Sequence, residues 1–169
     1  MALVVEDGSI VAGADSYLSL ADARTLAAKY GYDLPTDDTE AEAALRNGAM
    51  YIGLQEPAMC GRRVSAAQSL AFPRTGISLY SFPVANNTIP DQVKLAQVIA
   101  GVEYGSGAVV RGSTDGRITT MERVEGAVTV QYANNGNTGS SITITAAMDA
   151  LRPLLCGANN GSSFSVYRG

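Results

Sequence analysis

Residues 89–104, which read IPDQVKLAQVIAGVEY, decide the fold that we expect for this chain. Pro90 suits the first turn of a helix, where its missing N–H has no partner to lose, and Asp91 favours the positive end of the helix dipole. The apolar residues that follow are too numerous for one exposed face of a helix. We therefore predict a helix at about 90–104 that is the core helix of the domain or packs on two sides.

Further helices are predicted on both sides of this one. Capping boxes, in which a Ser or Thr is followed three residues later by a side chain that can reach back, occur at Ser19–Asp22, Thr39–Glu42 and Ser65–Gln68. Thr145 can cap a last, short helix, in which Pro153 leaves the final turn doubtful. These signals predict helices at about residues 20–30, 40–55, 66–70 and 146–155.

The hydrophobic period changes after the central helix. Residues 117–132 alternate on either side of a turn near Gly126, which predicts a β-hairpin with Arg and Glu on its outward face. The tail at 156–169 ends in apolar residues after a spacer rich in Gly, Asn and Ser, and it is either a docking arm or a disordered chain end. The predicted fold class is mainly α: a small helical bundle at 1–155 with an inserted β-hairpin and an extended C-terminal arm at 156–169.

The charge balance argues against tight binding to nucleic acid. The 169 residues include 12 basic and 16 acidic side chains, for a net charge of −4. An acidic chain gains little from neutralising phosphates and tends to repel DNA that passes near it. Charged residues make up only 17% of the chain, below the usual value of about 25%. Such a charge-poor surface fits a subunit that packs against neighbours, or simply a sequence rich in Ala and Gly.

The side chains that usually carry catalysis or hold metals are scarce. Histidine is absent, which excludes Ser-His-Asp and Cys-His sites, and the only lysines are Lys29 and Lys94. Cys60 and Cys156 form no CxxC pair, so a zinc site is not expected. We expect both to be free, buried thiols of a cytosolic protein, with a disulfide as the alternative. The chain is therefore predicted to have no enzymatic activity, no metal, no cofactor and no membrane-spanning segment.

One group of residues is a candidate for binding single-stranded nucleic acid. Arg62, Arg63 and Arg74 flank the short helix predicted at 66–70, and Phe72 adds an aromatic ring on which a base could stack. These few side chains make a small patch. Salt bridges within or between subunits are the better explanation of the arginines, and binding of single strands is the alternative.

A series of motifs, in its order and spacing, resembles a widespread phage family. The resemblance spans residues 2 to about 155, with Asp15 and Phe72 standing where the family more often has Asn and Trp. The motifs are Val5-Glu6-Asp7-Gly8, Ala14-Asp15-Ser16-Tyr17 with Ala21-Asp22-Ala23, the stretch 43–52 (AALRNGAMYI), Gly61-Arg62-Arg63 with 68–76 (QSLAFPRTG), 89–97 (IPDQVKLAQ) and 120–132 (TMERVEGAVTVQY).

Members of this family are often labelled DnaT-like single-stranded DNA-binding proteins, and they also resemble the head–tail connector, or adaptor, proteins of long-tailed bacteriophages. The adaptor resemblance implies a ring of this chain, commonly of twelve copies, under the portal protein and above the next neck protein, a tail terminator or collar component. Such a ring would lie in the virion neck after assembly in the cytoplasm of the host bacterium, with DNA only passing through its channel. The label implies the alternative, a single-stranded DNA-binding or replication-accessory protein.

The adaptor interpretation gives two segments a role. The hairpin is expected to join subunits, because a strand can extend the sheet of a neighbour, and the C-terminal arm is expected to grip the portal or an adjacent subunit. The residues assigned to the hairpin contact are Arg117, Thr119, Met121, Arg123, Glu125, Val128 and Val130, and those assigned to portal docking are Phe164, Val166, Tyr167 and Arg168.

Overall fold

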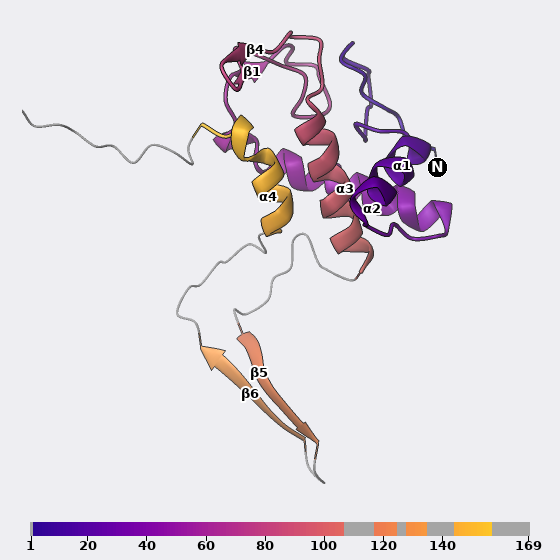
Figure 1. Cartoon of the computed structure of the whole chain (residues 1–169), viewed down its shortest axis with the longest axis vertical. Coiled ribbons are helices and arrows are strands. Elements are labelled where there is room, and N and C mark those ends of the chain that lie inside the picture. The colour runs from indigo at the N-terminus through magenta and orange to yellow at the C-terminus, as the bar shows by residue number, and fades with distance from the viewer. Residues whose placement is uncertain (1, 107–116, 125–127, 135–143, 157–169) are drawn as a thin grey trace, which may run out of the picture. The chain divides into compact units, whose positions relative to one another are not determined.

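The computed structural model describes residues 2–106, 117–124, 128–134 and 144–156 (Figure 1). The chain divides into two compact units, one of residues 1–108 with 144–169 and one of residues 109–143. The first unit contains the helices α1 (Leu20–Tyr30), α2 (Asp38–Leu54), α3 (Asp91–Gly105) and α4 (Thr145–Leu151), together with the short 3-10 helices η1 (Glu56–Ala58) and η2 (Arg152–Leu154). Helices were predicted close to all four α-helices, and these predictions are confirmed.

Helix α3 is the central element of the first unit, as its sequence predicts. Helices α1, α2 and α4 all pack against it, and the contact with α2 is the most extensive. Its buried residues follow one another without an exposed face between them: Val93, Ala96, Gln97, Val98, Ile99, Ala100 and Gly101. The prediction that this helix is buried on more than one side is therefore confirmed.

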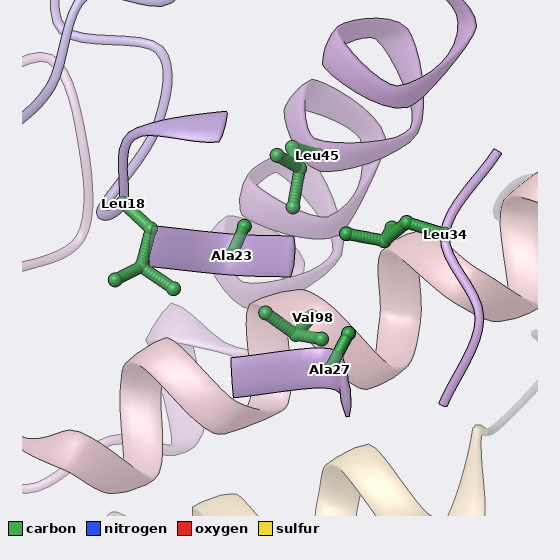
Figure 2. Close-up of a cluster of buried hydrophobic side chains, with 6 residues drawn as sticks. All are labelled: Leu18, Ala23, Ala27, Leu34, Leu45 and Val98. Atoms are coloured by element: carbon green, nitrogen blue, oxygen red, sulfur yellow. The ribbon is translucent and has the colours of Figure 1, made fainter. Parts of the chain in front are cut away.

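The core beneath α1 depends on small side chains. Figure 2 shows Ala23 and Ala27 of α1 beside Leu45 of α2 and Val98 of α3, with Leu18 and Leu34 at the edges of the cluster. Ala23 and Ala27 are 0% and 2% exposed. Because alanine adds little bulk, α1 approaches both other helices closely, and the larger side chains of α2 and α3 fill the space between them.

Helices α2 and α3 approach so closely at one point that only glycine fits. A Cβ atom on Gly48 would lie 2.3 Å from the carbonyl oxygen of Gln97, and a Cβ atom on Gly101 would lie 3.1 Å from the carbonyl oxygen of Ala44. The obstacle in both cases is backbone, which cannot turn away as a flexible side chain would. The distance between the two helices is therefore fixed by the glycines.

We predict that Gly48→Ala lowers the free energy of unfolding by about 1–3 kcal/mol, because the added methyl group forces the two helices apart. Gly53 offers a matched control in the same helix, since nothing lies within 4 Å of its Cβ position. Gly53→Ala should raise stability by about 0.5–1 kcal/mol through helix propensity. Urea denaturation of both variants measures the difference, and equal stability of the two would contradict this account of the crossing.

The starts of α1 and α2 test the predicted capping boxes. Ser19 caps α1 as predicted: its Oγ accepts a hydrogen bond from the backbone N–H of Asp22 at 3.1 Å and donates one to Asp22 Oδ2 at 2.6 Å. The prediction for α2 is wrong by two residues. Asp37 is the cap, and its Oδ1 accepts from the N–H of Glu40 at 3.0 Å. Asp at this position also interacts favourably with the positive end of the helix dipole.

The helix predicted at 66–70 does not form. Gln68 Oε1 accepts from the N–H of Ser65 at 3.2 Å, the bond expected of a capping box, but it also accepts from the N–H of Val64 at 3.0 Å. Its Nε2 donates to the carbonyl oxygens of Leu70 and Pro73 at 2.9 and 3.1 Å. The buried side-chain amide of Gln68 thus forms hydrogen bonds with the backbone of a compact loop. These bonds hold the segment in a non-helical conformation.

The segment between α2 and α3 makes the fold mixed α/β, so the prediction of a mainly α helical bundle is wrong. Strand β1 (Arg62–Arg63) pairs antiparallel with β2 (Arg74–Thr75), and β3 (Ser78–Leu79) pairs antiparallel with β4 (Phe82–Pro83). Pro57, Pro73, Pro83 and Pro90 divide this segment into pieces too short for helices, because proline inside a helix removes a hydrogen bond and clashes with the preceding turn.

The second unit contains the predicted β-hairpin. Strands β5 (Arg117–Val124) and β6 (Val128–Asn134) pair antiparallel, which confirms the prediction of a hairpin at about 117–132. The register shifts between Thr119 and Met121, which pair with Tyr132 and Gln131. Such a shift interrupts the regular alternation that the sequence suggested. The predicted turn at Gly126 lies outside the described residues.

Cys60 and Cys156 form a disulfide with a Cα–Cα distance of 4.8 Å, so the prediction of two free thiols is wrong. The short helices η1 and η2 end side by side, and Met59 and Leu155 form an antiparallel bridge there. The N–H of Cys60 donates to Leu154 and the N–H of Cys156 donates to Ala58, both at 2.9 Å. This backbone pairing brings the two cysteines together.

Candidate interaction surfaces

The predicted contact residues fall partly within the described chain. Arg117, Thr119, Met121 and Arg123 belong to β5, and Val128 and Val130 belong to β6. Glu125 and the four residues assigned to portal docking, Phe164, Val166, Tyr167 and Arg168, lie outside the described residues. Their roles, and the division of the chain into a domain at 1–155 and an arm at 156–169, stay predictions.

The predicted nucleic-acid patch is brought together by β1 and β2, but around a carboxylate. Arg63 lies opposite Arg74 in this strand pair. Glu56 lies between the two guanidinium groups: Arg63 Nε and Nη2 contact its Oε1 and Oε2 at 2.6 and 2.5 Å, and Arg74 Nη1 contacts Oε1 at 3.1 Å. Two like charges therefore lie side by side because a negative charge joins them.

Burial removes most of this group from contact with a nucleic acid. The side chain of Arg74 is only 5% exposed, and its guanidinium also donates to the carbonyl oxygens of Cys60 and Gly61 at 2.8 and 2.9 Å. Phe72 is 0% exposed and packs edge-on against Tyr17. Of the four predicted residues Arg62 is exposed and Arg63 is partly exposed. Phe72 cannot stack on a base in this fold, and Arg63, Phe72 and Arg74 instead make contacts that stabilise the loop between α2 and α3.

Electrostatics agree with a structural role for Glu56. Its hydrogen bond with Arg63 is the largest effect that holds the pKa of the Glu56 carboxyl below its usual value of 4.5, and the same bond raises the pKa of Arg63. Both groups are therefore ionised at neutral pH. The positive charges of Arg63 and Arg74 therefore interact with Glu56 of the same chain.

The motif around Tyr17 also has a structural role. Gln97 Oε1 accepts from the N–H of Tyr17 at 2.9 Å, and Gln97 Nε2 donates to Ser16 Oγ at 2.8 Å and to the carbonyl of Leu45 at 2.9 Å. Burial raises the pKa of the Tyr17 hydroxyl, which accepts from the N–H of Phe72. This network joins the N-terminal segment to α2, to α3 and to the loop that holds Phe72.

The buried carboxylate of Glu6 is equally well satisfied. Its Oε1 accepts from the N–H groups of Gly8 and Ile10 at 2.8 and 3.0 Å, and its Oε2 accepts from the N–H of Val11 at 2.9 Å. Among the described residues no buried side-chain nitrogen or oxygen lacks a hydrogen-bond partner. The buried polar residues of the described chain are thus occupied in holding its loops.

A surface that the sequence analysis missed lies at the turn between β3 and β4. Tyr80 and Phe82 are 73% and 75% exposed, the highest values among the large hydrophobic side chains of the described residues. Tyr80 and Ser81 both have positive φ, 52° and 72°, as in the tight two-residue turns that usually take Asn and Gly. We call residues 80–82 the aromatic tip. The sequence feature that corresponds to it is the stretch LYSFP at residues 79–83. It lies within a segment, 75–90, that contains no charged residue.

A cleft of about 520 Å³ lies between α1 and α3. Tyr30, which is 52% exposed, borders it, and the ammonium group of Lys29 lies 5.5 Å from the centroid of the Tyr30 ring. We call it the α1–α3 cleft, and its lining residues are Leu18, Asp22, Thr25, Leu26, Lys29, Tyr30, Asp91, Gln92, Lys94 and Leu95. The lining combines aliphatic side chains with two lysines and two aspartates, and Lys94 Nζ lies 3.5 Å from Asp91 Oδ1.

The described part of the chain offers neither a metal site nor a membrane-spanning helix. No group of three or more Cys, Asp or Glu side chains there is arranged to hold a metal ion. None of the helices in the same residues has both the length and the hydrophobicity to cross a bilayer.

A family model described as "Putative DnaT-like ssDNA binding protein" matches residues 1–169, the whole chain. No curated protein and no solved structure shows a significant match.

Proposed function

We propose that this chain, which belongs to the family described as "Putative DnaT-like ssDNA binding protein", is a non-enzymatic assembly subunit: the head-to-tail adaptor of a long-tailed bacteriophage. In this proposal copies of the chain form a ring, expected to hold twelve subunits, between the portal and the next neck protein. The ring belongs to the virion neck and surrounds the DNA channel.

The observation that carries the proposal is the separate β5–β6 unit. The strands are 8 and 7 residues long, and in the described chain each is paired with the other alone. A two-stranded hairpin by itself is marginally stable in water, and both of its edges offer unpaired backbone groups. A neighbouring subunit that pairs with one edge would supply the missing stabilisation. A hairpin with two unpaired edges therefore suits a subunit that assembles with neighbouring copies.

Charge supports passage of DNA over binding of DNA. The net charge is −4, and Arg63 and Arg74 are engaged by Glu56. Arg24 and Arg46 likewise pair with Asp38 and Asp15. A channel wall works best when it does not hold the DNA that slides past it. In the part of the chain whose side chains the structure describes, the ion pairs of Arg24, Arg46, Arg63 and Arg74 fit that need.

A second candidate is single-stranded DNA binding, which the family description favours over the adaptor role. The patch predicted for it, Arg62, Arg63, Phe72 and Arg74, is mostly buried or ion-paired. Binding of single strands would therefore have to use other residues, with Arg62 as the one exposed member of the original group.

The test is binding to the cognate portal protein, imaged by electron microscopy, with an oligonucleotide titration alongside. We expect a ring of density under the portal and no oligonucleotide binding at moderate salt. A variant in which 117–134 is replaced by a short Gly-Ser linker should keep the helical circular dichroism of the first unit and lose the ring. Removing 157–169 should weaken portal docking alone. Absence of portal binding, together with salt-sensitive binding to single strands, would reverse the ranking of the two candidates.

A further inference from the structure

We propose that the Cys60–Cys156 disulfide is a site of thiol–disulfide exchange, at which a small external thiol attacks the sulfur of Cys156 and the sulfur of Cys60 leaves. The chain thereby opens and recloses one covalent bond while it stays folded. This inference goes beyond the proposed function and does not depend on it, because it concerns a bond within one chain.

The two sulfurs differ in their access to solvent. Cys156 is an exposed residue, whereas Cys60 is half-buried. Arg152 and Pro153, which lie shortly before Cys156 in the chain, are exposed as well. An attacking thiolate must reach the sulfur that it binds, and exposed disulfides are the ones that exchange readily. Cys156 is therefore the sulfur that an external thiol reaches, and Cys60 is the leaving sulfur.

The surroundings of Cys60 favour its departure. The guanidinium of Arg74 donates to the carbonyl oxygens of Cys60 and Gly61 at 2.8 and 2.9 Å. Arg63 and Arg74 share the single carboxylate of Glu56, so this cluster carries a net positive charge beside Cys60. A leaving sulfur departs as a thiolate, and a nearby positive charge stabilises that thiolate. Charge and exposure thus favour the same direction of attack.

The backbone holds the two cysteines together without the help of the bond between their sulfurs. The N–H of Cys60 donates to Leu154 and the N–H of Cys156 donates to Ala58, and the residues just before the two cysteines form an antiparallel bridge. These contacts involve no sulfur, so opening the disulfide leaves them in place. The freed thiol of Cys60 then stays next to Cys156, at a high effective concentration, and can attack it again.

Reduction by this route takes two exchange steps. In the first, a thiolate forms a bond to the Cys156 sulfur as the Cys60–Cys156 bond breaks, and the electron pair of the broken bond leaves on Cys60, which takes up a proton from water. In the second, another thiolate attacks the external sulfur of this mixed disulfide and releases Cys156 as a thiolate. Two molecules of thiol thus become one molecule of their disulfide, and the two electrons that they lose reduce the protein disulfide to two thiols. With the disulfide of the same thiol as oxidant, the steps run in reverse.

The bond determines whether the chain is cross-linked around its second unit. It joins residues 96 apart, and the loop that it closes contains residues 109–143. A closed loop of this length restricts the unfolded chain and so favours the folded one. The cytosol keeps thiols reduced, and the extracellular medium does not. The chain therefore has one fold in both environments and a resistance to unfolding that rises on oxidation.

The experiment treats the oxidised full-length chain with reduced glutathione in buffer without denaturant. Samples are quenched with acid and labelled with a maleimide, and peptide mass spectrometry shows which cysteine carries glutathione and which carries the label. Circular dichroism follows the helices. A parallel reaction in urea gives the rate for the unfolded chain, and the double variant Cys60→Ser with Cys156→Ser shows any background modification.

We expect the folded chain to be reduced at a rate within about tenfold of the rate in urea, with an unchanged helical spectrum. Reduction that required global unfolding would be slower on the order of a thousandfold or more, the ratio of folded to unfolded chains. Glutathione should be found on Cys156 at least about tenfold more often than on Cys60, since Cys156 is the sulfur under attack.

The variant Cys60→Ser isolates the reclosing step. It and the reduced wild type are treated with oxidised glutathione, which forms a mixed disulfide with Cys156. The variant should accumulate roughly tenfold more of this mixed disulfide than the wild type, in which Cys60 expels glutathione and restores the internal bond.

Four results would each overturn the proposal. They are reduction only at the rate of unfolding, glutathione that is bound equally to both cysteines or mainly to Cys60, loss of the helical spectrum on reduction, and a wild type that accumulates as much mixed disulfide as Cys60→Ser. None of these measurements involves the portal or an oligonucleotide, so failure here leaves the proposed function unchanged.

Discussion

Replacing both cysteines, Cys60→Ser with Cys156→Ser, is expected to lower the free energy of unfolding by about 4–5 kcal/mol and the midpoint of thermal unfolding by roughly 10–20 °C. The disulfide joins residues 96 apart in the sequence. A cross-link that closes so long a loop removes many conformations from the unfolded chain, and the entropic stabilisation grows with the logarithm of the loop length. The measurement is thermal unfolding under oxidising conditions, with thiol labelling to establish the redox state.

The control for this prediction is the wild type after reduction. The reduced wild type keeps both cysteines of the oxidised protein but lacks the disulfide bond. It should therefore unfold near the temperature of the double variant. The backbone bridge between Met59 and Leu155 remains available to both, which should leave their folded structures similar. If the oxidised wild type and the double variant unfold at the same temperature, the bond is either not formed in solution or does not contribute to stability.

The sequence predicted the parts of the fold whose signals are local. The four α-helices follow from a period of 3.6 residues and from caps such as Ser19, and the hairpin follows from alternation around Gly126. A shift of two residues at the start of α2 is the expected error, because Asp37 and Thr39 are both good caps and only the structure chooses between them.

The parts that failed depend on contacts between distant residues. Gln68 makes the hydrogen bond of a capping box with Ser65. Its buried amide also donates to the carbonyl of Pro73, a contact that holds the segment as a loop and not as a helix. No sequence spacing predicts the disulfide, because Cys60 and Cys156 meet through tertiary packing, in which α4 packs on α3 and η2 lies beside η1. The fold class failed for the same reason, since the strand pairs between α2 and α3 are each two residues long.

The candidate sites show the same limit. Phe72 and Arg74 looked like an aromatic and basic patch because burial is not visible in composition, and both turned out to be among the buried residues of the unit. The aromatic tip was missed for the opposite reason. Aromatic residues in an uncharged segment are usually core, and only their exposure of 73% and 75% identifies Tyr80 and Phe82 as a surface.

Glu56→Gln is expected to lower the free energy of unfolding at pH 7 by about 3 kcal/mol, because it leaves the guanidinium of Arg74 buried without a counter-charge. We take the lower end of the usual range for such losses, since the Glu56 side chain is itself 23% exposed while that of Arg74 is 5% exposed. Gln keeps an oxygen that can accept one hydrogen bond and has the same shape, so the loss reports charge. Guanidinium and urea denaturation at several pH values measure it.

The pH dependence of this loss identifies its cause. The pKa of Glu56 is lower in the folded chain than its usual 4.5, so its stabilising effect is complete above that value and is lost as pH falls through the folded pKa. The difference between wild type and Glu56→Gln should therefore shrink as the solution is acidified below 4.5. Arg63→Gln is the matched control: Arg63 is 37% exposed and Glu56 keeps Arg74, so the cost should be only about 1 kcal/mol. A cost as large as that of Glu56→Gln would mean that Arg63, and not the burial of Arg74, makes Glu56 necessary.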